Sequence, residues 1–74
     1  MAGIYLIAFE QTHAALQAEE LLIEAGINVG IAPLPADIKA GCGFCVSLPA
    51  ERRENAEAVL KKNGLAYSGI YERI

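Results

Sequence analysis

The sequence is short of basic residues and has no long apolar run, and each shortage excludes a class of partner. Its six lysines and arginines stand against nine acids and form no cluster beyond Arg52-Arg53 and Lys61-Lys62. Because phosphate contacts need local positive charge, we expect no nucleic-acid partner. The longest apolar run, Ile4 to Phe9, is far too short to cross a bilayer, and no basic n-region or cleavage site precedes it. We therefore expect a cytoplasmic protein without a membrane partner.

Most signatures of enzyme chemistry are also missing. The chain has no P-loop, dinucleotide fingerprint, zinc-protease helix motif or Ser-His-Asp set. Its glutamates, among them Glu19-Glu20 and the segment Glu51 to Glu57, are typical of solvated helix faces rather than of paired acid-base groups. The sequence therefore predicts neither a cofactor nor a metal site.

Size and apolar content indicate one small domain, residues 1–74, with apolar surface to spare. A chain of 74 residues buries only about 60% of its unfolded surface. A hydrophobic content of 54% argues against disorder, yet so small a core leaves part of it uncovered. A homodimer, or docking onto a partner, would cover the remainder.

Apolar periodicity predicts four strands and two helices in the order β-α-β-β-α-β. The predicted elements are a strand over 4–9, a helix over 11–25, strands over 27–32 and 44–48, a helix opened by Pro49 and closed at Asn63-Gly64, and a strand over 67–74. Thr12 is the predicted N-cap of the first helix, and Gly26 is its C′ residue. Leu16 and Ile23 lie on the outer face of this helix, as isolated exposed residues or as an oligomer contact.

This order of elements favours an α+β fold, the ferredoxin-like split β-α-β sandwich. Its antiparallel four-stranded sheet has the strand order 4-1-3-2, and both helices lie on one face. The third strand runs antiparallel beside the first, so its start lies next to the beginning of the first helix. We therefore expect Cys42 to lie near Thr12 and His13, with Lys61 and Lys62 within range.

The segment Gly41-Cys42-Gly43-Phe44-Cys45 holds both cysteines of the chain. In the cytosol, two cysteines are more often reactive or metal-binding than paired in a structural disulfide. A helix N-terminus and nearby cations favour thiolate over thiol at Cys42, and Gly41 and Gly43, which lack a Cβ, admit another backbone or a ligand. We interpret Cys42 as an exposed nucleophile with His13 as its proton partner and Thr12 as a binding neighbour. The alternatives are a buried, inert Cys42 and a merely solvated His13.

Cys45 calls for a different interpretation, because it lies on the strand, on the face opposite Phe44 and Val46. A packing role is the simpler one. The C-x-x-C spacing also matches redox motifs, but here the motif opens a strand rather than a helix. Three extended residues place the two Cα atoms roughly 10 Å apart, beyond the ~7 Å limit for a disulfide, unless the chain turns at Gly43. Two cysteines are too few for a closed zinc site, although a dimer could supply four.

Residues along nearly the whole chain resemble a family of small bacterial selenium/sulfur carrier-like proteins, formerly a domain of unknown function. The matching positions are Tyr5-Leu6-Ile7, Phe9, Thr12-His13-Ala14, Leu16, Glu20-Leu21-Leu22, Ala25-Gly26, Pro33, Pro35, Ile38 and Cys42-Gly43. The Cys-Gly pair after a Pro-x-Pro loop is the most specific of them. Ala40-Gly41 departs from the family, which usually has a serine or another small polar residue before the pair. The resemblance implies that Cys42 carries persulfide sulfur or selenium, and it favours a carrier protein over an autonomous enzyme.

Three functions stay open. The first is a sulfur or selenium carrier, loaded by a donor protein such as a cysteine desulfurase or a TusA-like carrier, to which this domain is fused in some members of the family. The second is a non-catalytic regulatory or assembly module that dimerises through its apolar surface. The third is a small thiol redox or metal-binding protein in which Cys42 and Cys45 act together.

Overall fold

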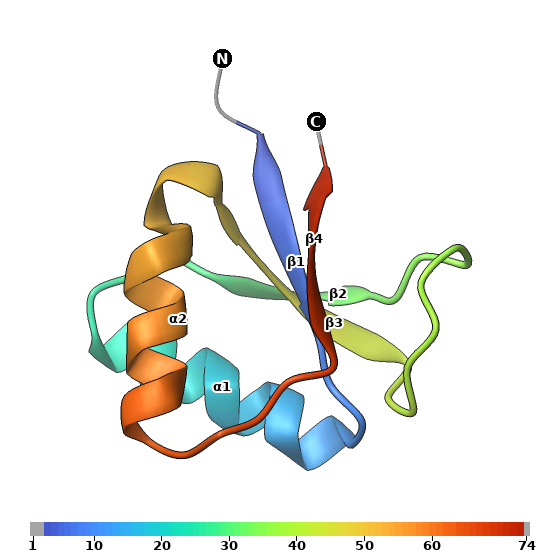
Figure 1. Ribbon diagram of the computed structural model, residues 1–74, viewed down its shortest axis with the longest axis horizontal. Helices are drawn as coiled ribbons and strands as arrows, with labels where there is room; N and C mark the ends of the chain where they lie inside the picture. Colours follow the sequence, from blue (N-terminus) through green and yellow to red (C-terminus); the bar gives the residue numbers. More distant parts are fainter. Residues whose placement is uncertain (1–2, 74) are drawn as a thin grey trace.

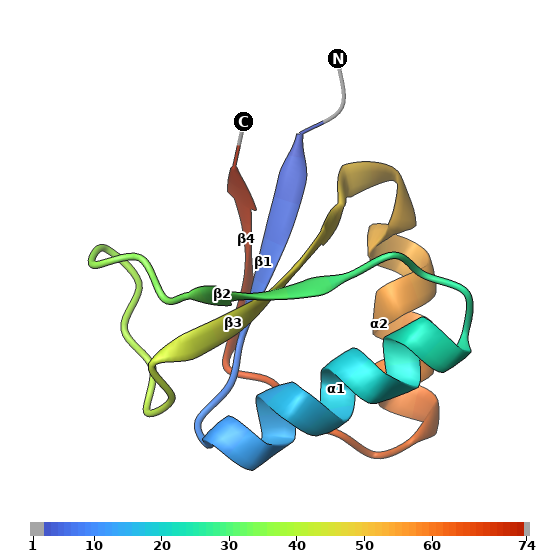
Figure 2. The ribbon, with the colours of Figure 1, turned by 180° about the vertical axis from the view of Figure 1, so that it is seen from behind.

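The computed structural model describes residues 3–73, and its elements follow the predicted order. They are the strands β1 (Ile4–Ala8), β2 (Gly30–Pro33), β3 (Phe44–Pro49) and β4 (Gly69–Arg73), the helices α1 (Thr12–Glu24) and α2 (Arg53–Lys62), and the 3₁₀ turn η1 (Ala50–Arg52). The strands form one antiparallel sheet in the order β2-β3-β1-β4. Both helices lie against the same face of this sheet (Figures 1 and 2). The ferredoxin-like α+β prediction is therefore confirmed.

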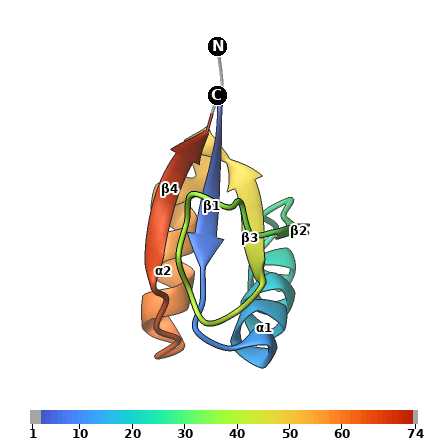
Figure 3. The ribbon, with the colours of Figure 1, turned by 90° about the vertical axis from the view of Figure 1, so that its right-hand side faces the viewer.

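Alternation along the strands divides the buried side chains into two clusters on opposite faces of the sheet. The helix-side cluster contains Ile7, Phe9, Ala15, Ala18, Leu22, Ile27, Cys42, Val46, Leu48, Ala56 and Leu60. The cluster on the other face is much smaller and contains Leu6, Ala8, Ile38 and Cys45. Ile38 belongs to the loop between β2 and β3, which lies across the sheet face that the helices leave free (Figure 3). The sheet is thus covered on both faces near β1.

Both helices end in the same glycine-dependent motif, and this motif shortens the strand that follows α1. After α1, Gly26 has a φ of +83°, and the N–H of Ile27 donates to the carbonyl of Leu22 at 2.9 Å. This is the Schellman pattern, in which the second residue beyond the cap bonds back to the last turn. The N–H of Ile27 is therefore committed to the helix. The predicted strand over 27–32 starts only at Gly30, so its first residues were assigned wrongly.

Other element boundaries differ from the predictions by a few residues. Thr12 is the first residue of α1 and not its N-cap, because Gln11 has the extended backbone of the cap. Pro49 ends β3 and precedes η1, so α2 begins only at Arg53. The last strand begins at Gly69 instead of residue 67, and the predicted end of this strand at Ile74, like Met1 and Ala2, lies outside the described residues.

Candidate functional site

Cys42 lies where β3 approaches the beginning of α1, as the antiparallel pairing of β1 and β3 predicts. Its N–H donates to the carbonyl oxygen of Phe9 at 3.1 Å, which extends the contact between the ends of β1 and β3. Its Sγ lies 3.5 Å from Oγ1 of Thr12, in the first turn of α1. The N–H of Phe44 also donates to this sulfur at 3.4 Å. The sulfur is therefore held between a hydroxyl and a backbone N–H.

The expectation that Cys42 is exposed is wrong. Only 1% of its surface is accessible, and its side chain belongs to the helix-side cluster. The bond to Phe9 fixes the backbone of Cys42 against the end of β1, and from this position the side chain is directed between the sheet and α1. A sulfur donor cannot reach Cys42 in this conformation.

The two glycines beside Cys42 have different surroundings. A Cβ on Gly41 would clash with the carbonyl oxygen of Glu10, whose side-chain Oε1 also accepts a hydrogen bond from the Gly41 N–H at 3.2 Å. A Cβ on Gly43 would meet nothing within 4 Å. Gly41 therefore allows the close approach of the chain's own backbone, as one part of the prediction stated, and only Gly43 faces open space. Glu10, which belongs to no motif in the sequence, holds the end of the loop in place through this hydrogen bond.

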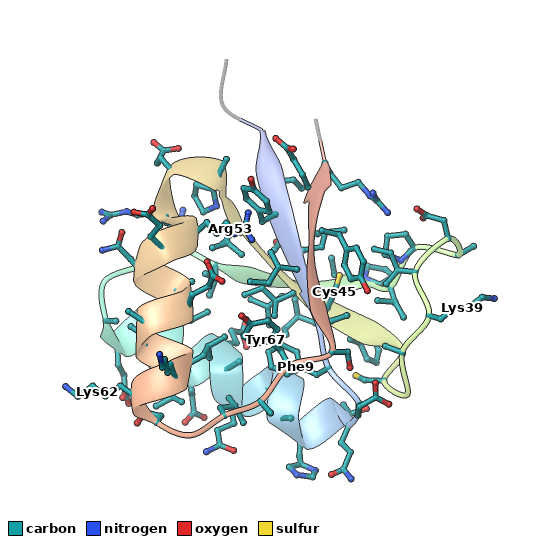
Figure 4. All side chains as sticks on the ribbon, in the orientation of Figure 1. Phe9, Lys39, Cys45, Arg53, Lys62 and Tyr67 are labelled. Carbon is teal, nitrogen blue, oxygen red and sulfur yellow. The ribbon has the colours of Figure 1, made fainter. Side chains whose placement is uncertain are left out.

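His13 and the lysines are not brought to the sulfur by any contact in the described part of the chain. His13 is exposed on α1, and none of the hydrogen bonds within residues 3–73 joins it to Cys42. Lys61 and Lys62 are exposed at the end of α2 and form no ion pair there. In Figure 4 the Lys62 side chain projects from α2 away from Phe9 and Cys45. Activation of Cys42 by these three residues stays a prediction.

Cys45 is buried on the other face of the sheet, which agrees with its interpretation as a packing residue. It pairs with Ala8 of β1 and packs with Leu6 and Ile38, and its Sγ lies 3.8 Å from the carbonyl oxygen of Pro33 (Figure 4). Burial raises the pKa of the Cys45 thiol, and the nearby Cys42 adds to the rise, while Arg73 opposes it. Cys45 is thus held as a neutral thiol.

The two cysteines do not form a redox pair in this structure. The chain bends at residues 41–43, but Cys42 points to the helix side of the sheet and Cys45 to the opposite side. Both are free thiols. Within the described residues there is also no cluster of three or more histidine, cysteine or acidic side chains that could hold a metal ion. The geometry therefore gives no support to a joint role of the two sulfurs within one chain.

A small apolar pocket of about 210 Å³ lies beside Cys42 on the protein surface. Its lining residues are Thr12, Ala15, Leu16, Ile31 and Phe44. Two of these, Thr12 and Phe44, also contact the Cys42 sulfur. Phe44 is 45% exposed, although it shares a face of the strand with the buried Val46. Its position at the first residue of the strand, next to Gly43, was the signal that could have indicated this exposure.

Fold and site together define a small ferredoxin-like protein with a cysteine fixed at the junction of a loop, a strand and a helix N-terminus. The chain belongs to the family described as "Putative Se/S carrier protein-like", whose model matches residues 4–72. It is also similar to the uncharacterized protein YtiA of Escherichia coli (strain K12), with 29% identity over 56 residues. That match covers 76% of this chain and 66% of YtiA, just under two thirds of the relative's length. No solved structure matches the chain significantly. No helix within residues 3–73 is long and apolar enough to span a membrane.

Proposed function

We propose that the protein is a sulfur or selenium carrier in which Cys42 holds the cargo. The family to which the chain belongs supports a carrier of one of these two elements. The observation that supports Cys42 as the carrier residue is the pair of groups at its sulfur. The hydroxyl of Thr12 and the N–H of Phe44 lie 3.5 Å and 3.4 Å from Sγ, and both can donate to an anionic sulfur.

The transfer step requires no external oxidant or reductant. The Cys42 thiolate attacks the outer sulfur of a donor persulfide, R–S–SH. The S–S bond of the donor breaks while a new S–S bond forms on Cys42, and the donor leaves as the thiolate R–S⁻. Cys42 then carries the persulfide –S–SH and passes its outer sulfur to an acceptor in the same way. A donor with selenium in the outer position would transfer selenium by the same sequence of bonds.

The surroundings of the two sulfurs favour Cys42 over Cys45 as the carrier. The attacking species in this chemistry is a thiolate, which needs hydrogen-bond donors or positive charge nearby. Cys42 has an N–H donor and a hydroxyl, whereas within residues 3–73 the only hydrogen-bond contact of the Cys45 sulfur is with a carbonyl oxygen, that of Pro33. Burial also raises the pKa of Cys45. The donor is a persulfide-bearing protein, such as a cysteine desulfurase or a TusA-like carrier.

Mass spectrometry of the intact protein tests the carrier role directly. Incubation with a cysteine desulfurase and cysteine should add the mass of one sulfur atom, and treatment with a thiol reductant should remove it. The Cys45→Ala variant should load as the wild type does, whereas Cys42→Ser should not load. Loading of Cys42→Ser to the level of the wild type would contradict the assignment of the carrier residue.

A positioning role of Thr12 can be tested in the same experiment. Thr12→Val keeps the shape of the side chain but removes the hydroxyl that faces Cys42, and Thr12→Ser keeps the hydroxyl. We expect slower loading for the valine variant and near-normal loading for the serine variant. Equal loading rates of the two variants would show that the hydroxyl does not act on the sulfur.

A second candidate function, dimerisation through α1, rests on two exposed apolar side chains. Leu16 and Ile23 lie two turns apart on α1 and are 51% and 54% exposed. Large apolar groups gathered on one helix face are typical of interaction surfaces. Sedimentation of the wild type and of Leu16→Glu would test this function, with Gln17→Glu as the control for added charge. A monomer at all concentrations would exclude a homodimer.

A further inference from the structure

The loop between β2 and β3, residues 34–43, is a closed surface loop that we call the strap. Its two ends are joined, because the N–H of Leu34 donates to the carbonyl of Gly43 at 3.0 Å and Pro33 pairs with Phe44. Surface loops of this length with adjacent ends form compact units, packed by their own side chains, and frequently have a function. In Figure 3 the strap extends from β2 across the face of β1 toward β4.

The strap is fastened to the sheet at two points along its length. Ile38 is 5% exposed and packs on Leu6, Ala8 and Cys45. Asp37 forms an ion pair of 2.7 Å with Arg73 of β4. The side chains of these two residues are 70% and 35% exposed, so the pair contributes little, because exposed ion pairs are screened by water. Burial of Ile38 is therefore the main attachment.

Cys42 belongs to the end of the same strap, and it is the third point of attachment. The hydrogen bonds of Gly41 to Glu10 and of Cys42 to Phe9 hold this end against β1. With 1% of its surface accessible, Cys42 becomes reachable only if this end lifts off. Only a few local contacts oppose this movement. The rest of the helix-side cluster, including Val46, Leu48 and the residues of the two helices, can stay packed while the end of the strap opens.

We propose that the strap is a lid that controls access to Cys42, so that the conformation described here is the closed state and sulfur exchange takes place in an open state. The purpose of this lid rests on the proposed carrier function, but its opening does not. Opening can be measured by alkylation of Cys42 without any sulfur donor. Because Ile38 also covers Cys45, opening of the whole strap exposes both thiols.

The test is the rate at which iodoacetamide alkylates Cys42 at a fixed pH, followed at Cys42 by peptide mass spectrometry, with Cys45 retained because it packs against Ile38. Ile38→Ala removes the main attachment of the strap and should accelerate alkylation about 30-fold, which corresponds to about 2 kcal/mol of lost packing. Val59→Ala, a truncation of a partly buried residue of α2 away from the strap, is the matched control. It should leave the alkylation rate nearly unchanged. Ile38→Val, with a smaller acceleration, replaces Ile38→Ala if the latter does not fold.

The dependence of the alkylation rate on urea decides between a lid and unfolding of the whole protein. A local opening exposes little surface, so low urea concentrations should change the wild-type rate only slightly. A rate that rises with urea as steeply as global unfolding, or equal acceleration by Ile38→Ala and Val59→Ala, would overturn the lid. A protein that opens in this way but takes up no sulfur would refute the carrier function and leave the lid standing. If the protein takes up sulfur but Cys42 is alkylated only through global unfolding, the lid is refuted and the carrier function stands.

Discussion

Replacing Gly41 by alanine tests how the end of the strap is held, and Gly43→Ala is its matched control. The new Cβ at position 41 would clash with the Glu10 carbonyl oxygen and lie 2.9 Å from Glu10 Oε1. A side-chain carboxylate can rotate away, but a backbone carbonyl cannot. The alanine therefore forces the chain at residues 41–42 away from β1.

The structure gives the magnitude of this effect. Moving the chain at Gly41 breaks its hydrogen bond to Glu10 and that of Cys42 to Phe9, each worth about 1 kcal/mol. Alanine also restricts the unfolded chain, which recovers a few tenths of a kcal/mol of stability. The free energy of unfolding should therefore fall by about 1–2 kcal/mol. For a domain of this size, that loss corresponds to a decrease in Tm of roughly 5–15 °C.

Gly43→Ala should behave in the opposite way. Its Cβ would enter open space, and the backbone φ of Gly43 is not in the left-handed region. Alanine at such a position is neutral or stabilises by about 0.4–1 kcal/mol. Each variant thus adds one methyl group, at positions two residues apart, and the expected effects on stability have opposite signs.

Urea unfolding followed by circular dichroism, together with the rate of Cys42 alkylation, measures both effects. Gly41→Ala should unfold at a lower urea concentration than the wild type, and its Cys42 should be alkylated faster. Gly43→Ala should match or exceed the wild type in stability. If Gly41→Ala is as stable as Gly43→Ala, the contact between Gly41 and Glu10 does not hold the strap, and the reasoning is refuted.

Three further predictions follow from the site and its surroundings. If His13 is the proton partner of Cys42, His13→Ala should load sulfur more slowly than the wild type, as measured by mass spectrometry; a rate within about twofold of the wild type would contradict this role for a side chain that is exposed and forms no hydrogen bond with Cys42 among the described residues. Burial raises the pKa of Cys45, so the unfolded thiol ionises first and the wild type should lose stability as the pH rises above about 8.5; Cys45→Ala should show less of this loss in urea titrations at pH 7 and pH 10. Asp37→Asn removes only an exposed ion pair and should lower the free energy of unfolding by less than about 1 kcal/mol, with a smaller difference at high salt.

Topology was the part of the site that the sequence could predict. The order of elements implies that β3 runs antiparallel beside β1, and this alone places Cys42 next to Thr12. Gly26 was recognisable as a helix C′ residue because glycine tolerates a positive φ there. Such features depend on periodicity and on backbone sterics, both of which can be predicted from the local sequence.

The burial of Cys42 was not predictable, because it depends on the path of the strap. Ile38 is an apolar residue in a loop with no periodic pattern, and nothing in its neighbours indicates that it packs on the far face of the sheet. The partnership of Gly41 with Glu10 joins residues 31 positions apart through one side chain. Contacts of this kind arise from the closed shape of the strap rather than from residue type.

The burial of Cys42 in the helix-side cluster also affects how a partner would recognise a loaded carrier. A persulfide adds one sulfur atom to a side chain that already fills its place, and overfilling a packed core costs about 1–3 kcal/mol. Under the proposed function, the empty protein is therefore the better packed of the two forms, and cargo itself loosens the strap. A partner could then distinguish full from empty carriers by their shape, before any contact with the sulfur.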